Sequence, residues 1–166
     1  MKIAVLGGSF DPPHNGHLFA AKSLLKQRLC QKIILVPCLR HPFGKKLSKA
    51  AHRLAMTRLF ENENIEVSDI EMLREETSYT IDTLNALKTQ FPKDYFVWII
   101  GSDQVKDFKK WKGWKEIKEK FGLIVVPRKV DISSSEIKKR IKEGKDIEGF
   151  VPKEVGRYII QHGLYL

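Results

Sequence analysis

The segment that most constrains the fold lies near residue 1. An apolar run, Ile3–Leu6, stops at Gly7 and Gly8, and a helical pattern begins around His14 and His17. That order predicts a strand, a tight turn and the N-terminus of a helix. A helix N-terminus carries free N–H groups and the positive end of the helix dipole, so it binds phosphate readily. The two imidazoles, three residues apart, would point to one place and add N–H donors. This segment therefore predicts a phosphate-binding site.

The rest of the chain alternates strand patterns with helix patterns. We expect strands at Lys2–Leu6, Lys32–Val36, Ile65–Ser68, Tyr95–Ile100 and Gly122–Val126, and helices at Asn15–Leu29, Ser48–Phe60 and Thr80–Phe91. One or two short helices are expected within Ser102–Lys120, and two more helices after Ser133. Strands separated by helices pair in parallel through right-handed crossovers. The prediction is an α/β fold: a single Rossmann-like domain over residues 1–166, with a five-stranded parallel sheet and helices on both faces.

The charge of the chain narrows the class of its partners. Lysine and arginine number 30 against 20 aspartates and glutamates, a net charge of +10. This balance favours anionic partners, either nucleic acid or small phosphorylated ligands. The lysine-rich stretch Lys106–Lys120 contains aromatic residues, which keeps nucleic-acid binding open. Because the other lysines are spread along the chain, we favour lysines that face water and a small phosphorylated ligand.

Cysteine usage and hydropathy indicate the compartment. Cys30 and Cys38 form no C-x-x-C pair, so neither a zinc site nor a disulfide framework is expected. The chain shows no charged leader and no apolar run of membrane-spanning length. We therefore expect a cytoplasmic protein with free thiols and no membrane contact. The sequence leaves open whether the protein forms a homo-oligomer.

Two motifs resemble the signatures of the nucleotidylyltransferase superfamily. The first is Gly8-Ser9-Phe10-Asp11-Pro12 followed by His14-x-Gly16-His17, and the second is Ile132-Ser133-Ser134-Ser135-Glu136-Ile137. Members of the superfamily join a phosphorylated substrate to a nucleoside monophosphate taken from a triphosphate. Alone, the second motif could be only a capping box formed by Ser133 and Glu136. Both motifs together, in this order, favour the superfamily.

Further segments are similar to one branch, the nicotinate-nucleotide adenylyltransferases. These segments are Ser78–Leu84, Ile100–Asp103 with the tryptophans that follow, and Tyr158–Tyr165, so the resemblance covers nearly the whole chain. It implies that AMP passes from ATP to nicotinate mononucleotide, which gives deamido-NAD and pyrophosphate in NAD biosynthesis. It also implies Mg²⁺ bound with ATP, and no metal site built by the protein itself.

The resemblance implies roles for individual residues. His14 and His17 are the expected catalytic residues, with His17 the more important in the transition state. The expected ATP contacts are Gly8, Ser9, Phe10, Gly16, Gly101, Asp103, Ile132, Ser133, Ser134, Ser135 and Lys138. The expected contacts with the mononucleotide are Lys45, Lys46, Arg53, Tyr79, Thr80, Trp111 and Arg128.

Three features depart from the family pattern. Lys138 stands where the family usually has arginine, which keeps the charge but loses the bidentate fork. The loop after residue 37 has unusual spacing, so either Lys45 or Lys46 matches the family's phosphate-contacting lysine. The segment after Arg128 is shorter than in the family, which leaves the acceptor less certain.

Several alternatives remain open from the residues alone. Asp103 is also a good helix N-cap, and Arg53 could be a surface charge. Either Trp111 or Trp114 could be a core residue instead of a ligand contact. Another adenylyltransferase, such as pantetheine-phosphate adenylyltransferase, would use the same chemistry. A non-catalytic nucleotide-binding or nucleic-acid-binding protein is the alternative of a different class.

Overall fold

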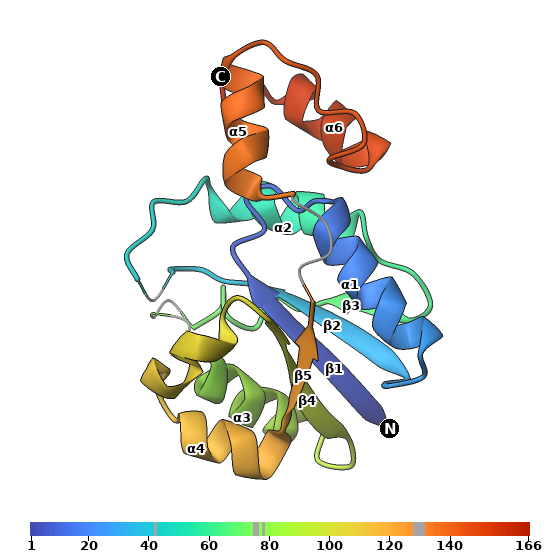
Figure 1. Cartoon of the computed structure of the whole chain (residues 1–166), viewed down its shortest axis with the longest axis vertical. Coiled ribbons are helices and arrows are strands. Elements are labelled where there is room, and N and C mark those ends of the chain that lie inside the picture. The colour runs from blue at the N-terminus through green and yellow to red at the C-terminus, as the bar shows by residue number, and fades with distance from the viewer. Residues whose placement is uncertain (42, 75–76, 78, 128–131) are drawn as a thin grey trace.

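The sheet is five-stranded and parallel, as predicted. The structure is a computed structural model that describes residues 1–41, 43–74, 77, 79–127 and 132–166. Its strands are β1 (Lys2–Gly8), β2 (Lys32–Pro37), β3 (Ile65–Val67), β4 (Tyr95–Gly101) and β5 (Leu123–Val126), in the order β3-β2-β1-β4-β5 (Figure 1). All four neighbouring pairs are parallel. The first strand of the chain is therefore the middle strand of the sheet.

The helices follow the predicted order with shorter bounds. They are α1 (Asn15–Lys26), α2 (Ala50–Arg58), α3 (Thr80–Gln90), the 3₁₀ helix η1 (Val105–Lys110), α4 (Trp114–Glu116), the π-helical turn η2 (Ile117–Phe121), α5 (Ser134–Lys142) and α6 (Lys153–Gln161). Helix α1 ends three residues earlier than expected, and Arg28 just beyond it adopts a left-handed conformation (φ 55°). Within the described ranges, no helix is long and apolar enough to cross a bilayer.

Helices cover both faces of the sheet, because successive side chains of a strand point to opposite sides. In β4, Val97 and Ile99 pack in the core formed with α1, α2, α5 and α6. The alternate residues Phe96, Trp98 and Ile100 pack in a second core with α3, η1 and η2. Figure 1 shows α3 and α4 on one side of the strands and α1 and α2 on the other. The predicted two-faced α/β architecture is confirmed.

The order of the strands locates the site. From β1 the chain continues outward through β2 to β3, and then returns to β4 on the other side of β1. Ligands of such sheets bind beyond the carboxyl ends of the strands where the order reverses. That point lies between the ends of β1 and β4. The motif that follows β1 and the Gly101 segment that ends β4 both lie there.

Candidate active site

The turn predicted after β1 is present. Its left-handed residue is Phe10 (φ 47°), whose side chain is buried, and not Gly7 or Gly8. Gly7 serves packing instead, because a Cβ there would lie 2.3 Å from the Trp98 ring. The buried Phe10 anchors the turn, and Gly7 lets a large aromatic ring pass beneath it.

The two histidines meet as predicted. His14 is the N-cap of α1 and His17 its third residue, and their rings stack with centroids 3.8 Å apart and planes 27° apart. The backbone N–H of His14 donates to Nδ1 of His17 at 3.2 Å. Because Nδ1 is the acceptor in this bond, the neutral imidazole carries its proton on Nε2. His17 therefore presents an Nε2–H donor on the side away from its own backbone.

The protonation state of His17 follows from its surroundings. Burial, and then the charge of His14, hold the pKa of His17 well below its usual 6.5. The ring of Phe10 packs against it at 4.7 Å between centroids. At neutral pH, His17 is thus a neutral hydrogen-bond donor and carries no charge of its own before a phosphate arrives.

A buried carboxylate braces the turn from behind. Asp11 is 0% exposed, and its Oδ2 accepts hydrogen bonds from Nζ of Lys138 at 2.8 Å and from the N–H of Ser48 at 3.1 Å. Its Oδ1 accepts from the hydroxyl of Tyr165 at 2.8 Å. Burial alone would raise the pKa of Asp11, but these three donors outweigh it and lower the pKa. Asp11 therefore ties the turn to α5, to the segment before α2 and to the chain after α6.

The second motif lies against the first. Ser133 caps α5, since its Oγ accepts the N–H of Glu136 at 3.1 Å, which confirms Ser133 as the N-cap and forms one of the two bonds of the predicted capping box. Ser134 Oγ donates to the carbonyl of Pro12 at 2.9 Å, while Ser135 is exposed. Helix α5 thus directs its N-terminus toward the segment Ser9–His17 after β1, called the histidine turn below, as the phosphate-site prediction requires.

Two predicted ATP contacts, Gly16 and Ile132, lie next to each other. A Cβ on Gly16 would lie 3.0 Å from the His14 ring and 3.9 Å from the Ile132 carbonyl. At the end of β4, a Cβ on Gly101 would lie 2.5 Å from Oδ1 of the exposed Asp103. Both glycines therefore leave room for a polar group of the predicted site.

A cleft of about 360 Å³ opens beside the turn. Four predicted residues line it, namely Gly8, Tyr79, Thr80 and Trp111. Trp114 is not among the described residues that line it, which separates the two tryptophans that the sequence left equivalent. The sequence reasoning missed Phe43, Trp98, Cys38, Glu71 and Gln104, which also line the cleft. Trp98 was hidden within an apolar strand pattern, and Phe43 sits in a loop where the sequence directed attention to the basic residues.

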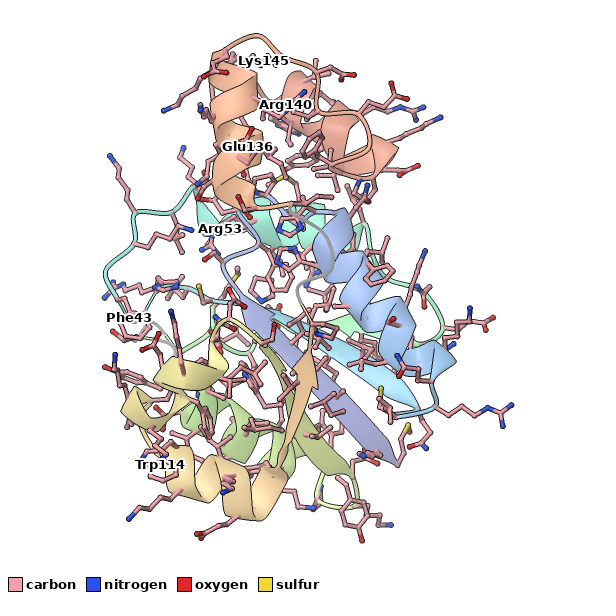
Figure 2. All side chains as sticks on the ribbon, viewed as in Figure 1. Phe43, Arg53, Trp114, Glu136, Arg140 and Lys145 are labelled. Carbon is pink, nitrogen blue, oxygen red and sulfur yellow. The ribbon has the colours of Figure 1, made fainter. Side chains whose placement is uncertain are left out.

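The basic loop, residues 40–47, carries the predicted lysines, and its residue 42 lies outside the described residues. Lys45 lines a second cleft of about 590 Å³, and His41 lines both clefts. Lys46 is exposed. Figure 2 labels Phe43, which lies on this loop and is 73% exposed. Arg128 lies outside the described residues.

Arg53 requires a correction. We expect it from the sequence to contact the mononucleotide, yet it is only 1% exposed and all three of its side-chain nitrogens donate to backbone carbonyls. Four of the five guanidinium N–H groups are engaged in this way, so Arg53, although it also lines the second cleft, cannot offer a phosphate the two-pronged contact expected of an arginine. Arg53, labelled in Figure 2, holds the backbone of Ser9, Cys38, Leu39 and Ser48 through these bonds.

Known proteins share this architecture. Residues 5–140 match the model of the cytidylyltransferase-like family. A protein of Methylacidiphilum infernorum named a probable nicotinate-nucleotide adenylyltransferase is 36% identical, over 99% of this chain and 92% of that protein. One of the same name from Thermus thermophilus is 35% identical, over 99% of this chain and all of that protein. A solved structure described by the same activity, from Vibrio parahaemolyticus, has a TM-score of 0.85 and 25% identity, over 99% of this chain and 94% of its own.

Proposed function

The chain belongs to the cytidylyltransferase-like family and, within it, to the nicotinate-nucleotide adenylyltransferases, and we propose that it transfers the adenylyl group of ATP to nicotinate mononucleotide. The products are deamido-NAD and pyrophosphate, so the enzyme acts in NAD biosynthesis. One observation supports the proposed location of this reaction in the structure. The stacked pair His14 and His17 lies at the carboxyl end of the middle strand, against the N-terminus of α5 and beside the open cleft.

The chemistry needs positioning more than proton transfer. The acceptor phosphate is already ionised at neutral pH, so no general base is required. Catalysis then consists of in-line alignment and stabilisation of the charge on the α-phosphate of ATP. His17 suits that task, because its neutral ring directs an Nε2–H donor whose tautomer is set by the bond to His14. We assign the transition-state contact to His17 and a ground-state phosphate contact to His14.

The two substrates divide the site between them. The triphosphate would lie between the histidine turn and the start of α5, where Ser135 and the helix N-terminus offer donors. The mononucleotide would enter the cleft, with its pyridine ring near Trp111 and its carboxylate near Thr80 and the backbone of Tyr79. The phosphate of the mononucleotide would lie toward Lys45.

Mg²⁺ enters this proposal as part of the ATP substrate. Both oxygens of Asp11, the acidic residue within the turn, already accept hydrogen bonds from protein donors. Mg²⁺ commonly keeps several waters and binds through substrate phosphates. We therefore propose that the ion bridges polyphosphate oxygens, and that the protein contacts the phosphates and not the ion.

The location of the enzyme is also a proposal. Cys30 and Cys38 are both free and buried, which suits a reducing cytoplasm. Fractionation of cells that express a tagged copy would test it. Recovery of the protein in the cytoplasmic fraction supports the proposal, and recovery with membranes or outside the cell contradicts it.

The decisive experiment measures pyrophosphate release from ATP and Mg²⁺ with one acceptor at a time. Nicotinate mononucleotide, nicotinamide mononucleotide and phosphopantetheine are offered separately at equal concentration. The proposal predicts the largest kcat/KM with nicotinate mononucleotide. Release only with phosphopantetheine would keep the phosphate site and overturn the assignment of the cleft. If none of the three acceptors led to pyrophosphate release, a non-catalytic binding protein would become the better interpretation.

A further inference from the structure

Arg53 of α2 makes a set of backbone contacts that have no role in the proposed reaction as described above. Its Nε donates to the carbonyl of Ser48 at 2.9 Å. Its Nη1 donates to the carbonyls of Ser9 at 2.8 Å and Cys38 at 2.7 Å, and its Nη2 reaches the carbonyl of Leu39 at 3.3 Å. One buried guanidinium therefore joins three separate segments of backbone.

These carbonyls frame the basic loop. Cys38 and Leu39 lead into residues 40–47, and Ser48 follows them. The fourth carbonyl, that of Ser9, belongs to the histidine turn. The backbone of Ser48 is held on both sides of its Cα, because its N–H donates to Asp11 and its carbonyl accepts from Arg53. Both ends of the loop are thus tied to the turn that carries the histidines.

Only arginine can make this junction with one side chain. A guanidinium has five donors in a fixed plane, whereas a lysine ammonium is a single point on a flexible stem. Burying the charge is costly unless the donors are satisfied, and here four carbonyl dipoles offset that cost. Replacing Arg53 with lysine keeps the charge but cannot hold both ends of the loop together.

We propose that Arg53 is a positioning residue that sets the distance between the basic loop and the histidine turn. The inference rests on the proposed function, in which Lys45 on that loop meets the phosphate of the mononucleotide. The guanidinium does not touch the substrate. It fixes the backbone at residues 38–39 and 48, and so keeps Lys45 at a constant distance from His17. Lys45 can then contact the acceptor phosphate while His17 contacts the α-phosphate of ATP.

The kinetic test compares Arg53→Lys with Arg58→Lys on the same helix, where Arg58 makes an exposed ion pair with Asp69 at 3.3 Å. For Arg53→Lys we expect the KM for the mononucleotide to rise about tenfold, while the KM for ATP changes less than about twofold. Arg58→Lys should change neither. If Arg53 only stabilised the fold, kcat would fall with the active fraction and both KM values would stay the same, which would overturn the proposal.

A double-mutant cycle with Lys45→Ala identifies the path of the effect. If Arg53 acts through the loop, Arg53→Lys should raise the mononucleotide KM much less in the Lys45→Ala background than in the wild type. Equal fold-changes in both backgrounds would contradict the proposed path.

Limited trypsin digestion without any substrate tests the loop itself. Cleavage after Lys45 should be at least about fivefold faster in Arg53→Lys than in the wild type and in Arg58→Lys, because the loop opens more often. Equal cleavage rates in the three proteins would overturn the proposal. This measurement is independent of the reaction, so an enzyme inactive with every acceptor would refute the proposed function and still leave the digestion to decide whether Arg53 holds the loop.

Discussion

The two ends of the proposed active site are built differently. At the phosphate end, formed by the histidine turn and the start of α5, the groups that brace the backbone are buried: Asp11 is 0% exposed and accepts three hydrogen bonds, and His14 is 8% exposed, while Ser135 faces solvent. At the acceptor end, formed by the cleft beside Tyr79 and Trp111, the walls stand partly in solvent, and Phe43 is 73% exposed. The phosphate end is therefore fixed in place before a ligand binds. The acceptor end keeps exposed apolar surface that a ligand can cover.

The difference follows from what each end has to do. Stabilising charge on a transferring phosphate requires donors that are already aimed, and buried hydrogen-bond networks fix such donors. Selecting an acceptor requires contact area, which exposed aromatic side chains supply when a ring packs on them. Changes at the phosphate end should therefore affect stability and turnover, and changes at the acceptor end should affect the KM for the acceptor.

The largest expected effect is on stability, from Asp11→Asn. The substitution keeps the size of the side chain but removes the buried charge that pairs with Lys138, and breaking such a pair costs about 3 kcal/mol. Urea unfolding measures the loss. The matched control is Asp69→Asn, which removes an exposed pair with Arg58 and should cost less than about 0.5 kcal/mol. Similar losses in both variants would mean that the network does not hold the phosphate end.

The next effect is on turnover, from His17→Ala. Removing one preorganised donor to the transferring phosphate should lower kcat about a hundredfold, or roughly 2.7 kcal/mol, with the fold intact by circular dichroism. His162→Ala is the control, because His162 packs against Tyr158 on α6 and has no proposed role. A His17→Ala enzyme with near-normal kcat would remove this residue from the mechanism.

A smaller effect distinguishes the acceptor end. Trp111→Ala should raise the KM for nicotinate mononucleotide about fivefold and leave the KM for ATP nearly unchanged, because stacking on one aromatic ring contributes about 1 kcal/mol. Trp114→Ala is the matched variant, since both rings contact Phe108 edge-on but only Trp111 is among the described cleft residues. If Trp114→Ala raised the acceptor KM as much, the assignment of the cleft would be wrong.

The sequence predicted what depends on local pattern. Short continuous apolar runs located the five strands, and the spacing of His14 and His17 placed their rings together, because both features depend on residues a few positions apart. The N-cap role of Ser133 was predictable for the same reason. Helix ends were less accurate, since the turn at Arg28 depends on how α1 meets the next strand.

The sequence could not predict what depends on distant partners. The hydroxyl that braces Asp11 belongs to Tyr165, which lies 154 residues away along the chain. Arg53 looked like a surface or substrate-binding charge, because nothing in the chain pattern shows that four carbonyls surround it. Phe43 entered the cleft wall only through the course of the loop. In each case the missing information was three-dimensional proximity.

The smallest effect is the pH dependence of stability, and it also separates the two ends. Unfolded His17 has a pKa near 6.5, whereas burial and the charge of His14 hold its folded pKa well below that value. Below pH 6.5 the unfolded chain therefore binds a proton that the folded chain does not bind, so the free energy of unfolding falls as the pH falls, by at most about 1.4 kcal/mol per pH unit for one group.

Urea unfolding at pH 7.5 and at pH 5.5 measures this loss. Between the two pH values, the free energy of unfolding of the wild type should fall by about 1 kcal/mol more than that of His17→Gln. His41 at the acceptor end has its pKa lowered by burial and by Lys45, but less strongly, so His41→Gln should remove less of the loss. Equal removal by both variants would mean that the two ends bury their histidines alike, and the contrast between a prepared phosphate end and an open acceptor end would not hold.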